Sequence, residues 1–242
     1  KGNPESFNLL DNLLSAQFFR LSFWKVATEE INYRRFFNIN ELISLRIEDG
    51  TVFNHTHCLI FKLIAEGKVT GLRIDDIDGL YDPTAYLEKV REKAGQLYIV
   101  VEKILHLKEE LPSFWPVQGT TGYDFLDYAN GVFCKGQHQG SFNRIYSQFT
   151  GHHTSYEDLV ADKKRLIIGK HMAADVDNLA LLMKRISGRY RHGGDITLYG
   201  LKRTLVEVMA QFPIYRTYVS HDIFREADRG YIKQAIRTAA QS

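Results

Sequence analysis

The stretch Val69-Thr-Gly-Leu-Arg-Ile-Asp-Asp-Ile-Asp-Gly-Leu80 joins a short apolar strand pattern to a cluster of acids. Because successive side chains of a strand point to opposite faces, Arg73 and Asp75 are predicted to share one face. A cation this close favours the ionised form of a carboxylate. An aspartate held ionised at the end of a strand is a candidate nucleophile.

A second strand pattern follows at Leu97-Tyr-Ile-Val-Val-Glu102, a β-branched apolar run that also ends in a carboxylate. Between the two runs a helix is predicted, since Pro83 suits its first turn and Gly95 its C-terminal cap. The order strand, helix, strand predicts a βαβ unit with parallel strands. Asp75 and Glu102 are then expected at the same end of neighbouring strands, which is where barrel glycosidases carry their carboxylates.

The composition is ordinary for a globular protein: 242 residues, 44% hydrophobic, 25% charged, with a formal net charge of +2. This near balance gives no reason to expect nucleic acid or a membrane surface as partner. Cys58 and Cys134 are too few for a disulfide framework and favour a reducing compartment, hence a cytoplasmic protein. No apolar run approaches the roughly 20 residues of a transmembrane helix. The chain lacks an initial Met and a signal peptide, which suggests an internal piece of a longer polypeptide.

The pattern changes near residue 126, where strand-like runs give way to long helical ones. We therefore predict an α/β protein of two parts: residues 1–125 as part of a (β/α)₈ (TIM) barrel and residues 126–242 as an α-helical insertion subdomain. Helices are expected at 5–30, 51–66, 158–168, 175–187, 196–210 and from 221 onward. Short strands are expected near 31–37, 119–125 and 212–219.

Five motifs in the chain carry a resemblance to a known family. They are Gly71-Leu-Arg-Ile-Asp75, Val101-Glu-Lys-Ile-Leu105, Ile31-Asn-Tyr-Arg-Arg-Phe-Phe-Asn-Ile-Asn-Glu-Leu42, Gly119-Thr-Thr-Gly-Tyr-Asp-Phe125 and Phe212-Pro-Ile-Tyr-Arg-Thr-Tyr218. The first two resemble motifs of the α-amylase superfamily, glycoside hydrolase family 13. The other three point to the maltooligosyl trehalose synthase family within it.

The resemblance implies an isomerase of trehalose biosynthesis that converts the reducing-end α-1,4 linkage of a maltooligosaccharide to α,α-1,1. Asp75 matches the nucleophile, Glu102 the general acid/base, and Arg73 the arginine that orients the nucleophile. The implied mechanism is a retaining double displacement in which Glu102 starts protonated. The implied partner is the maltooligosaccharide, and no cofactor or metal is expected.

Three departures from the family pattern stand out. Asp76 occupies a position where the synthases usually have His, and strand parity predicts that it faces away from Asp75. The Asp-x-x-x-Asn-His strand end of the superfamily is absent from the sequence. His221-Asp222 has the residue types of the pair that supplies the third catalytic carboxylate, although its surroundings do not match. The chain therefore resembles the middle of the enzyme.

Other interpretations remain open at this stage. His55 and His57 have the spacing of two metal ligands, although a structural role is favoured, and Cys58 is predicted to lie in the core. Basic runs such as 163–165 are interpreted as solvated helix faces. For function, the alternatives are another α-amylase-family hydrolase or transglycosylase acting on α-glucans, a catalytically incomplete fragment, and a helical interaction module.

Overall fold

The structure is a computed structural model that describes residues 3–37, 39–107, 109–220 and 224–241. The chain divides into two compact units. Unit 1 contains Lys1–Ser44 and Arg165–Val206, and unit 2 contains Leu45–Lys164 and Glu207–Ser242. Helices α7 (Tyr156–His171) and α9 (Leu198–Ala210) each begin in one unit and end in the other.

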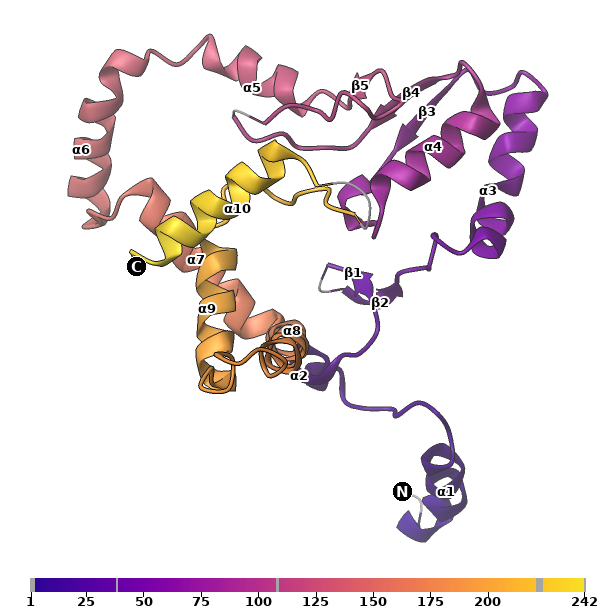
Figure 1. The fold of residues 1–242 in the computed structure, drawn as a ribbon. Helices are drawn as coiled ribbons and strands as arrows, with labels where there is room; N and C mark the ends of the chain where they lie inside the picture. Colours follow the sequence, from indigo (N-terminus) through magenta and orange to yellow (C-terminus); the bar gives the residue numbers. More distant parts are fainter. Residues whose placement is uncertain (1–2, 38, 108, 221–223, 242) are drawn as a thin grey trace. The chain divides into compact units, whose positions relative to one another are not determined.

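Unit 2 holds a three-stranded sheet in the order β3 (Gly71–Ile74), β4 (Tyr98–Val101), β5 (Gly119–Thr120) (Figure 1). Both neighbouring pairs are parallel. Helix α4 (Pro83–Ala94) connects β3 to β4, so the predicted βαβ unit is confirmed.

Local chemistry explains where α4 begins and ends. The Asp82 side chain accepts a hydrogen bond from the Ala85 N–H at 3.0 Å, and Pro83 occupies the first turn. Gly95 ends the helix at φ +64°, a conformation that glycine adopts without steric cost.

The core of unit 2 lies between α4 and the sheet. Leu87 and Val90 of α4 are almost fully buried, as are Ile99 and Val101 of β4. Phe53 of α3 (Gly50–Ala65) packs in the same cluster as Val90 and Ile99. Packing of the buried side of β4 on α4 therefore holds the sheet in place. The candidate site lies at the ends of its strands.

The remaining helices that lie wholly in the described part of unit 2 are one short 3₁₀ helix between β3 and α4 and four helices after the sheet. They are η3 (Ile77–Gly79), α5 (Tyr123–Gly131), η4 (Gly136–His138), α6 (Gln139–Thr150) and α10 (Glu226–Ala239). The four helical regions predicted after residue 126 are found as α7, α8 (Ala173–Ser187), α9 and α10, with boundaries moved by a few residues. Helices α5, η4 and α6 were not predicted.

Unit 1 is mainly helical. Its elements are η1 (Pro4–Phe7), α1 (Asn8–Ser15), η2 (Trp24–Val26), α2 (Ala27–Glu30), β1 (Arg35–Phe36), β2 (Ile39–Ile43) and α8 (Ala173–Ser187). Strands β1 and β2 pair antiparallel, and α2 contacts α8. An ion pair between Lys202 and Asp177 at 2.7 Å joins α9 to α8.

Three sequence predictions need correction. The helix expected over residues 5–30 is interrupted, because 16–23 is non-helical between α1 and η2. Residues 212–219 form no strand: side chains rather than a β-ladder hold this segment. The strand expected over 119–125 is only β5, and α5 begins at Tyr123.

The sheets in the described residues have three and two strands, so no closed barrel is present there. The partial-barrel interpretation and the boundary at residue 126 stay predictions. None of the helices in the described part of the chain is both long and apolar enough to cross a membrane.

Candidate active site at the ends of β3 and β4

The parallel register places Asp75 and Glu102 at the same edge of the sheet. Ile74 pairs with Val101, and the Glu102 N–H donates to the Ile74 carbonyl oxygen at 2.7 Å. Each strand therefore ends one residue before its carboxylate. The placement predicted for Asp75 and Glu102 is found, while their catalytic roles stay proposals.

Arg73 and Asp75 form an ion pair, with Nη2 of Arg73 2.5 Å from Oδ1 of Asp75. Their side chains are 57% and 63% exposed, so solvent reaches both groups. The pair has the geometry expected from strand parity, since residues two apart lie on one face. The guanidinium can hold one carboxylate oxygen and leave the other for chemistry.

Glu102 is held by the backbone that follows Asp75. The Asp76 N–H donates to Oε2 of Glu102 at 3.0 Å. Asp76 has φ +49° and ψ +41°, a left-handed conformation that is uncommon for a residue other than glycine. This turn directs the N–H across to the neighbouring strand.

The left-handed turn sets the direction of the Asp76 side chain. Strand parity does not govern its side chain, because the backbone at Asp76 is left-handed rather than extended. A Cβ built on Gly79 would lie 2.6 Å from Oδ2 of Asp76, so the carboxylate lies over Gly79 inside the turn. Only a residue without a side chain fits at position 79 as long as the Asp76 carboxylate stays there.

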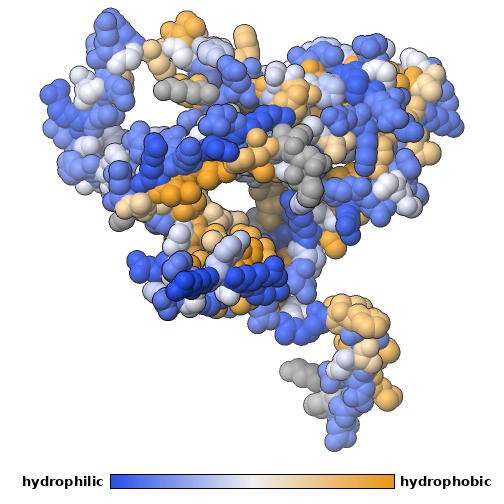
Figure 2. Space-filling view, viewed as in Figure 1, coloured by the Kyte–Doolittle hydropathy of each residue, from blue (hydrophilic) through white to orange (hydrophobic). Residues whose placement is uncertain are grey.

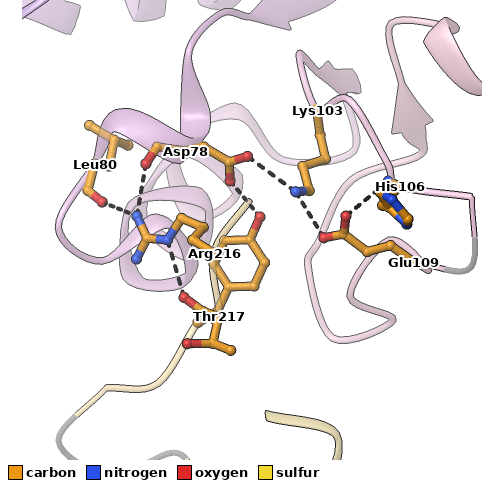
Figure 3. A network of polar contacts seen from close by, with 8 residues as sticks. Asp78, Leu80, Lys103, His106, Glu109, Arg216 and Thr217 are labelled. Atoms are coloured by element: carbon orange, nitrogen blue, oxygen red, sulfur yellow. Dashed lines mark hydrogen bonds and ion pairs between the residues drawn. The ribbon is translucent and has the colours of Figure 1, made fainter. Parts of the chain in front are cut away.

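A buried polar network lies beside this turn, and sequence reasoning missed it (Figure 3). Lys103, the residue after Glu102, is fully buried. Its Nζ lies 3.2 Å from Oδ2 of Asp78 and 2.9 Å from Oε1 of Glu109. Glu109 also accepts a hydrogen bond from the His106 N–H at 3.0 Å. The only signal in the sequence was a lysine two residues after the end of a buried strand.

The segment around Arg216 joins the same network from 138 residues away. Nη1 of Arg216 donates to the carbonyl oxygens of Asp78 at 2.8 Å and Leu80 at 2.6 Å. The Tyr218 hydroxyl donates a hydrogen bond to Oδ1 of Asp78. The two largely buried carboxylates of Asp78 and Glu109 thus share the buried cation of Lys103, while Arg216 binds backbone carbonyl oxygens beside them.

Burial raises the pKa of the Tyr218 phenol well above its usual value. The hydrogen bond to Asp78 and the negative charges of Asp78 and Glu109 act in the same direction, while Arg216 opposes them. Tyr218 therefore stays a hydrogen-bond donor at any physiological pH. Its ring packs edge-on against Trp115, whose Nε1–H donates to Oγ1 of Thr84 at 3.0 Å.

The histidines and cysteines do not form a metal site in the described residues, where no group of three or more potential ligands occurs. His57 packs on Phe53, and its Nε2 lies 2.9 Å from the Tyr86 hydroxyl, in keeping with a structural role. Burial raises the pKa of Tyr86 to about 12.

Cys58 is exposed, so its predicted place in the core is wrong; α3 buries Phe53 and leaves Cys58 on its outer face. His221 and Asp222 lie outside the described residues. A cavity of about 210 Å³ near the start of α4 does not include Arg73, Asp75 or Glu102. Its lining residues are Ile47, Glu48, Tyr81, Asp82, Ala85, Tyr86 and Lys89.

These features define an α/β protein with paired carboxylates at the carboxyl ends of parallel strands. No family model matches the chain. A curated protein of Mycobacterium tuberculosis, named provisionally as a maltooligosyl trehalose synthase, is 38% identical over 149 residues. The match covers 61% of this chain and 19% of that protein.

Solved structures give the same result. The maltooligosyltrehalose synthase of Arthrobacter ramosus is 31% identical with a TM-score of 0.79, over 100% of this chain and 29% of that one. A Sulfolobus tokodaii protein described as a hypothetical maltooligosyl trehalose synthase has a TM-score of 0.76 and 31% identity, over 98% and 30% of the two chains. The chain is therefore a homologue of part of the maltooligosyl trehalose synthases, which confirms the resemblance seen in the motifs.

Proposed function

We propose that the protein carrying this chain is an intramolecular transglucosylase that forms maltooligosyl trehalose, an isomerase of trehalose biosynthesis. The observation that carries the proposal is the placement of Asp75 and Glu102 at adjacent ends of β3 and β4. It is supported by 38% identity over 149 residues to a protein provisionally named for this activity. The substrate is a maltooligosaccharide. Both cysteines are free, which agrees with a cytoplasmic location.

In the proposed mechanism, Asp75 attacks the anomeric carbon of the penultimate sugar while Glu102 protonates the departing glycosidic oxygen. Arg73 holds the nucleophile in position through its ion pair. The released glucose stays bound and turns, and its anomeric hydroxyl attacks the glycosyl-enzyme as Glu102 takes the proton. The new linkage is α,α-1,1, and no cofactor or metal takes part.

The same proposal extends to the fold. Residues 1–125 are assigned to part of a (β/α)₈ barrel and residues 126–242 to a helical insertion. Support comes from the parallel order β3-β4-β5, because barrel sites lie at the carboxyl ends of such strands. On this proposal the remaining strands of the barrel lie outside these residues, since the chain spans 19% and 29% of the relatives that it matches.

A hydrolase of α-glucans is the second candidate, because paired carboxylates at the ends of neighbouring strands serve hydrolysis and transfer alike. The two functions differ in their products, since hydrolysis yields reducing sugars and transfer to the anomeric hydroxyl yields a non-reducing one. A fragment without the remaining strands would give neither.

The test is incubation of the natural polypeptide that contains these residues with maltopentaose, followed by chromatography of the products. We expect a non-reducing product from the unaltered protein. Asp75→Asn should lower its formation by at least about 10³-fold, because the nucleophile is lost. Asp177→Asn is the matched control, since it removes an ion-paired carboxylate of similar exposure that lies outside the site.

Normal product formation by Asp75→Asn contradicts the assignment of the nucleophile. Reducing products alone from the unaltered protein favour the hydrolase. Loss of activity in Asp177→Asn as well would trace the effect to general destabilisation rather than to the nucleophile.

A further inference from the structure

The turn after β3 gives the two oxygens of Glu102 different roles. Oε2 accepts the hydrogen bond from the Asp76 N–H at 3.0 Å. In a neutral carboxyl group the carbonyl oxygen is the good acceptor, and the hydroxyl oxygen carries the proton. The Asp76 N–H therefore selects Oε2 as the carbonyl oxygen and leaves Oε1 as the oxygen that carries the proton.

This arrangement depends on a backbone conformation that is unfavourable by itself. Asp76 is left-handed, and residues in this region persist when their surroundings hold them there. Within the turn, the Gly79 N–H donates to the Asp76 carbonyl oxygen at 3.0 Å. The turn is therefore closed locally, but its orientation relative to β4 needs a further contact.

Asp78 supplies that contact. Its Oδ2 is ion-paired with Nζ of Lys103, which follows Glu102 on the other strand, at 3.2 Å. Its Oδ1 accepts the hydrogen bond from Tyr218. The Asp78 side chain is only 13% exposed, so both interactions are shielded from water and are stronger for it. The turn that bears the Asp76 N–H is thus tied to the strand end that bears Glu102.

The neighbours of Asp78 are fixed in turn. Lys103 is held on its other side by Glu109 at 2.9 Å, and Arg216 binds the carbonyl oxygens of Asp78 and Leu80 (Figure 3). These residues can affect the reaction without contacting the substrate, because they fix the position of Glu102. A misplacement of about 1 Å at a reacting group can cost about 100-fold in rate.

We infer that Asp78, Lys103 and Tyr218 are positioning residues for the proposed acid/base: they hold the turn at Asp76 so that its N–H binds Oε2 of Glu102, and Oε1 donates the proton. In the step concerned, the proton moves from Oε1 to the glycosidic oxygen as that carbon–oxygen bond breaks. The bond from Asp75 to the anomeric carbon forms in the same step. This inference rests on the proposed function.

The experiment compares two substrates in their first turnover. Maltopentaose needs a proton from Glu102 for its leaving group. α-Maltosyl fluoride forms the same kind of glycosyl-enzyme, but fluoride leaves without a proton, so its release needs the nucleophile and little from the acid. A variant that misplaces the acid slows the first substrate selectively, whereas general damage slows both.

Tyr218→Phe is the main variant, because it removes one hydroxyl and keeps the ring packed on Trp115. We expect it to slow the first turnover of maltopentaose by about 10- to 100-fold. Fluoride release should change by less than about 3-fold, which is within the scatter of conservative changes. Thr84→Val is the matched control, since it removes a hydroxyl whose buried hydrogen bond, accepted from Nε1–H of Trp115 at 3.0 Å, does not involve Asp78. It should leave the ratio of the two rates unchanged.

Lys103→Met is the second variant. It should slow the first turnover of maltopentaose relative to fluoride release more strongly than Tyr218→Phe does. It leaves Asp78 and Glu109 without their shared cation, so its folding is checked by circular dichroism. If it does not fold, Tyr218→Phe decides the question alone. Equal loss on both substrates, or no loss on either, in Tyr218→Phe overturns the positioning role while the proposed function stands.

The failure of the proposed function looks different. In that case the unaltered protein converts neither substrate, or Asp75→Asn retains both activities, and the positioning role falls with it. The two failures are therefore separated by the unaltered protein and Asp75→Asn, which are measured beside Tyr218→Phe.

Discussion

Two adjacent glycines show how strongly a single position depends on its surroundings. A Cβ on Gly193 would lie 1.8 Å from the carbonyl oxygen of Ser187, whereas a Cβ on Gly194 meets nothing within 4 Å. The first contact involves backbone, so a side-chain rotation cannot relieve it. The loop after α8 therefore accepts a methyl group at one of these positions and not at the other.

We expect Gly193→Ala to lower the free energy of unfolding by about 2 kcal/mol or more, because the loop must move away from Ser187. Gly194→Ala should change it by less than about 0.5 kcal/mol, as open surface positions do. Denaturant unfolding followed by circular dichroism measures both. Equal effects from the two variants would mean that Gly193 is not packed against α8 as described.

The sequence predicted the placement of single residues correctly where spacing along one strand determines that placement. The Arg73–Asp75 ion pair follows from parity, and the position of Glu102 at the edge of the sheet follows from the strand that precedes it. It failed for Cys58, because the apolar positions on α3 surround most of the helix and do not say which face is buried.

At the scale of the element, α3 depends on its first turn. The Asp49 side chain accepts hydrogen bonds from the N–H groups of Thr51 at 2.8 Å and Val52 at 3.3 Å. The Val52 and then the Thr51 N–H bonds lower the pKa of Asp49 below its usual 3.8, since they favour the ionised carboxylate. The end of the helix is therefore stabilised by a charge as well as by a cap.

Because the pKa of Asp49 is lower in the folded state, its charge-dependent contribution is fully present above about pH 4. It is lost as the pH falls through the lowered value. We expect Asp49→Asn to reduce the thermal midpoint by a constant amount between pH 7 and about pH 5, and by progressively less toward pH 2. Asparagine keeps a capping oxygen, so the difference isolates the charge.

Glu88→Gln, which changes an exposed carboxylate of α4, controls for general effects of acid on the protein. The control should show no comparable trend. If the difference in thermal midpoint between the unaltered protein and Asp49→Asn stayed constant down to pH 2, the charge of Asp49 would have no part in capping α3.

Elements were predicted best where periodicity and end signals agreed. Pro83 and Gly95 mark α4 to within a residue, and the apolar run before Glu102 marks β4. The segment 212–219 has the composition of a strand but no neighbour to pair with in the described residues. Its conformation is set by Arg216 and Tyr218, which bind a loop far away in the sequence.

At the scale of the whole chain, a large apolar surface remains uncovered. Helix α1 has no buried residue, and Leu9, Leu10 and Leu13 are 84%, 49% and 59% exposed. Figure 2 shows this helix with an apolar face toward solvent. Contiguous apolar surface of this kind favours association in water. The strand β3 also has one unpaired edge among the described strands.

We expect the 242-residue chain to associate with itself as its concentration rises, as measured by sedimentation velocity. Leu9→Lys with Leu13→Lys should weaken association at least about 10-fold, because each buried leucine contributes about 1.5–3 kcal/mol. Asn8→Lys with Asn12→Lys adds the same charge to exposed polar positions of α1 and should have a smaller effect. Monomers at every concentration would show that this apolar face does not drive association.

The sequence by itself determined the βαβ unit, the ends of its helix and the edge of the sheet where Asp75 and Glu102 lie. These follow from side-chain periodicity and from the backbone preferences of proline and glycine, which act over a few residues. Only the tertiary structure decided the left-handed turn at Asp76 and the burial of Lys103 between Asp78 and Glu109. The same holds for the return of Tyr218 to that network, since contacts between segments about 140 residues apart depend on packing, which no local pattern records.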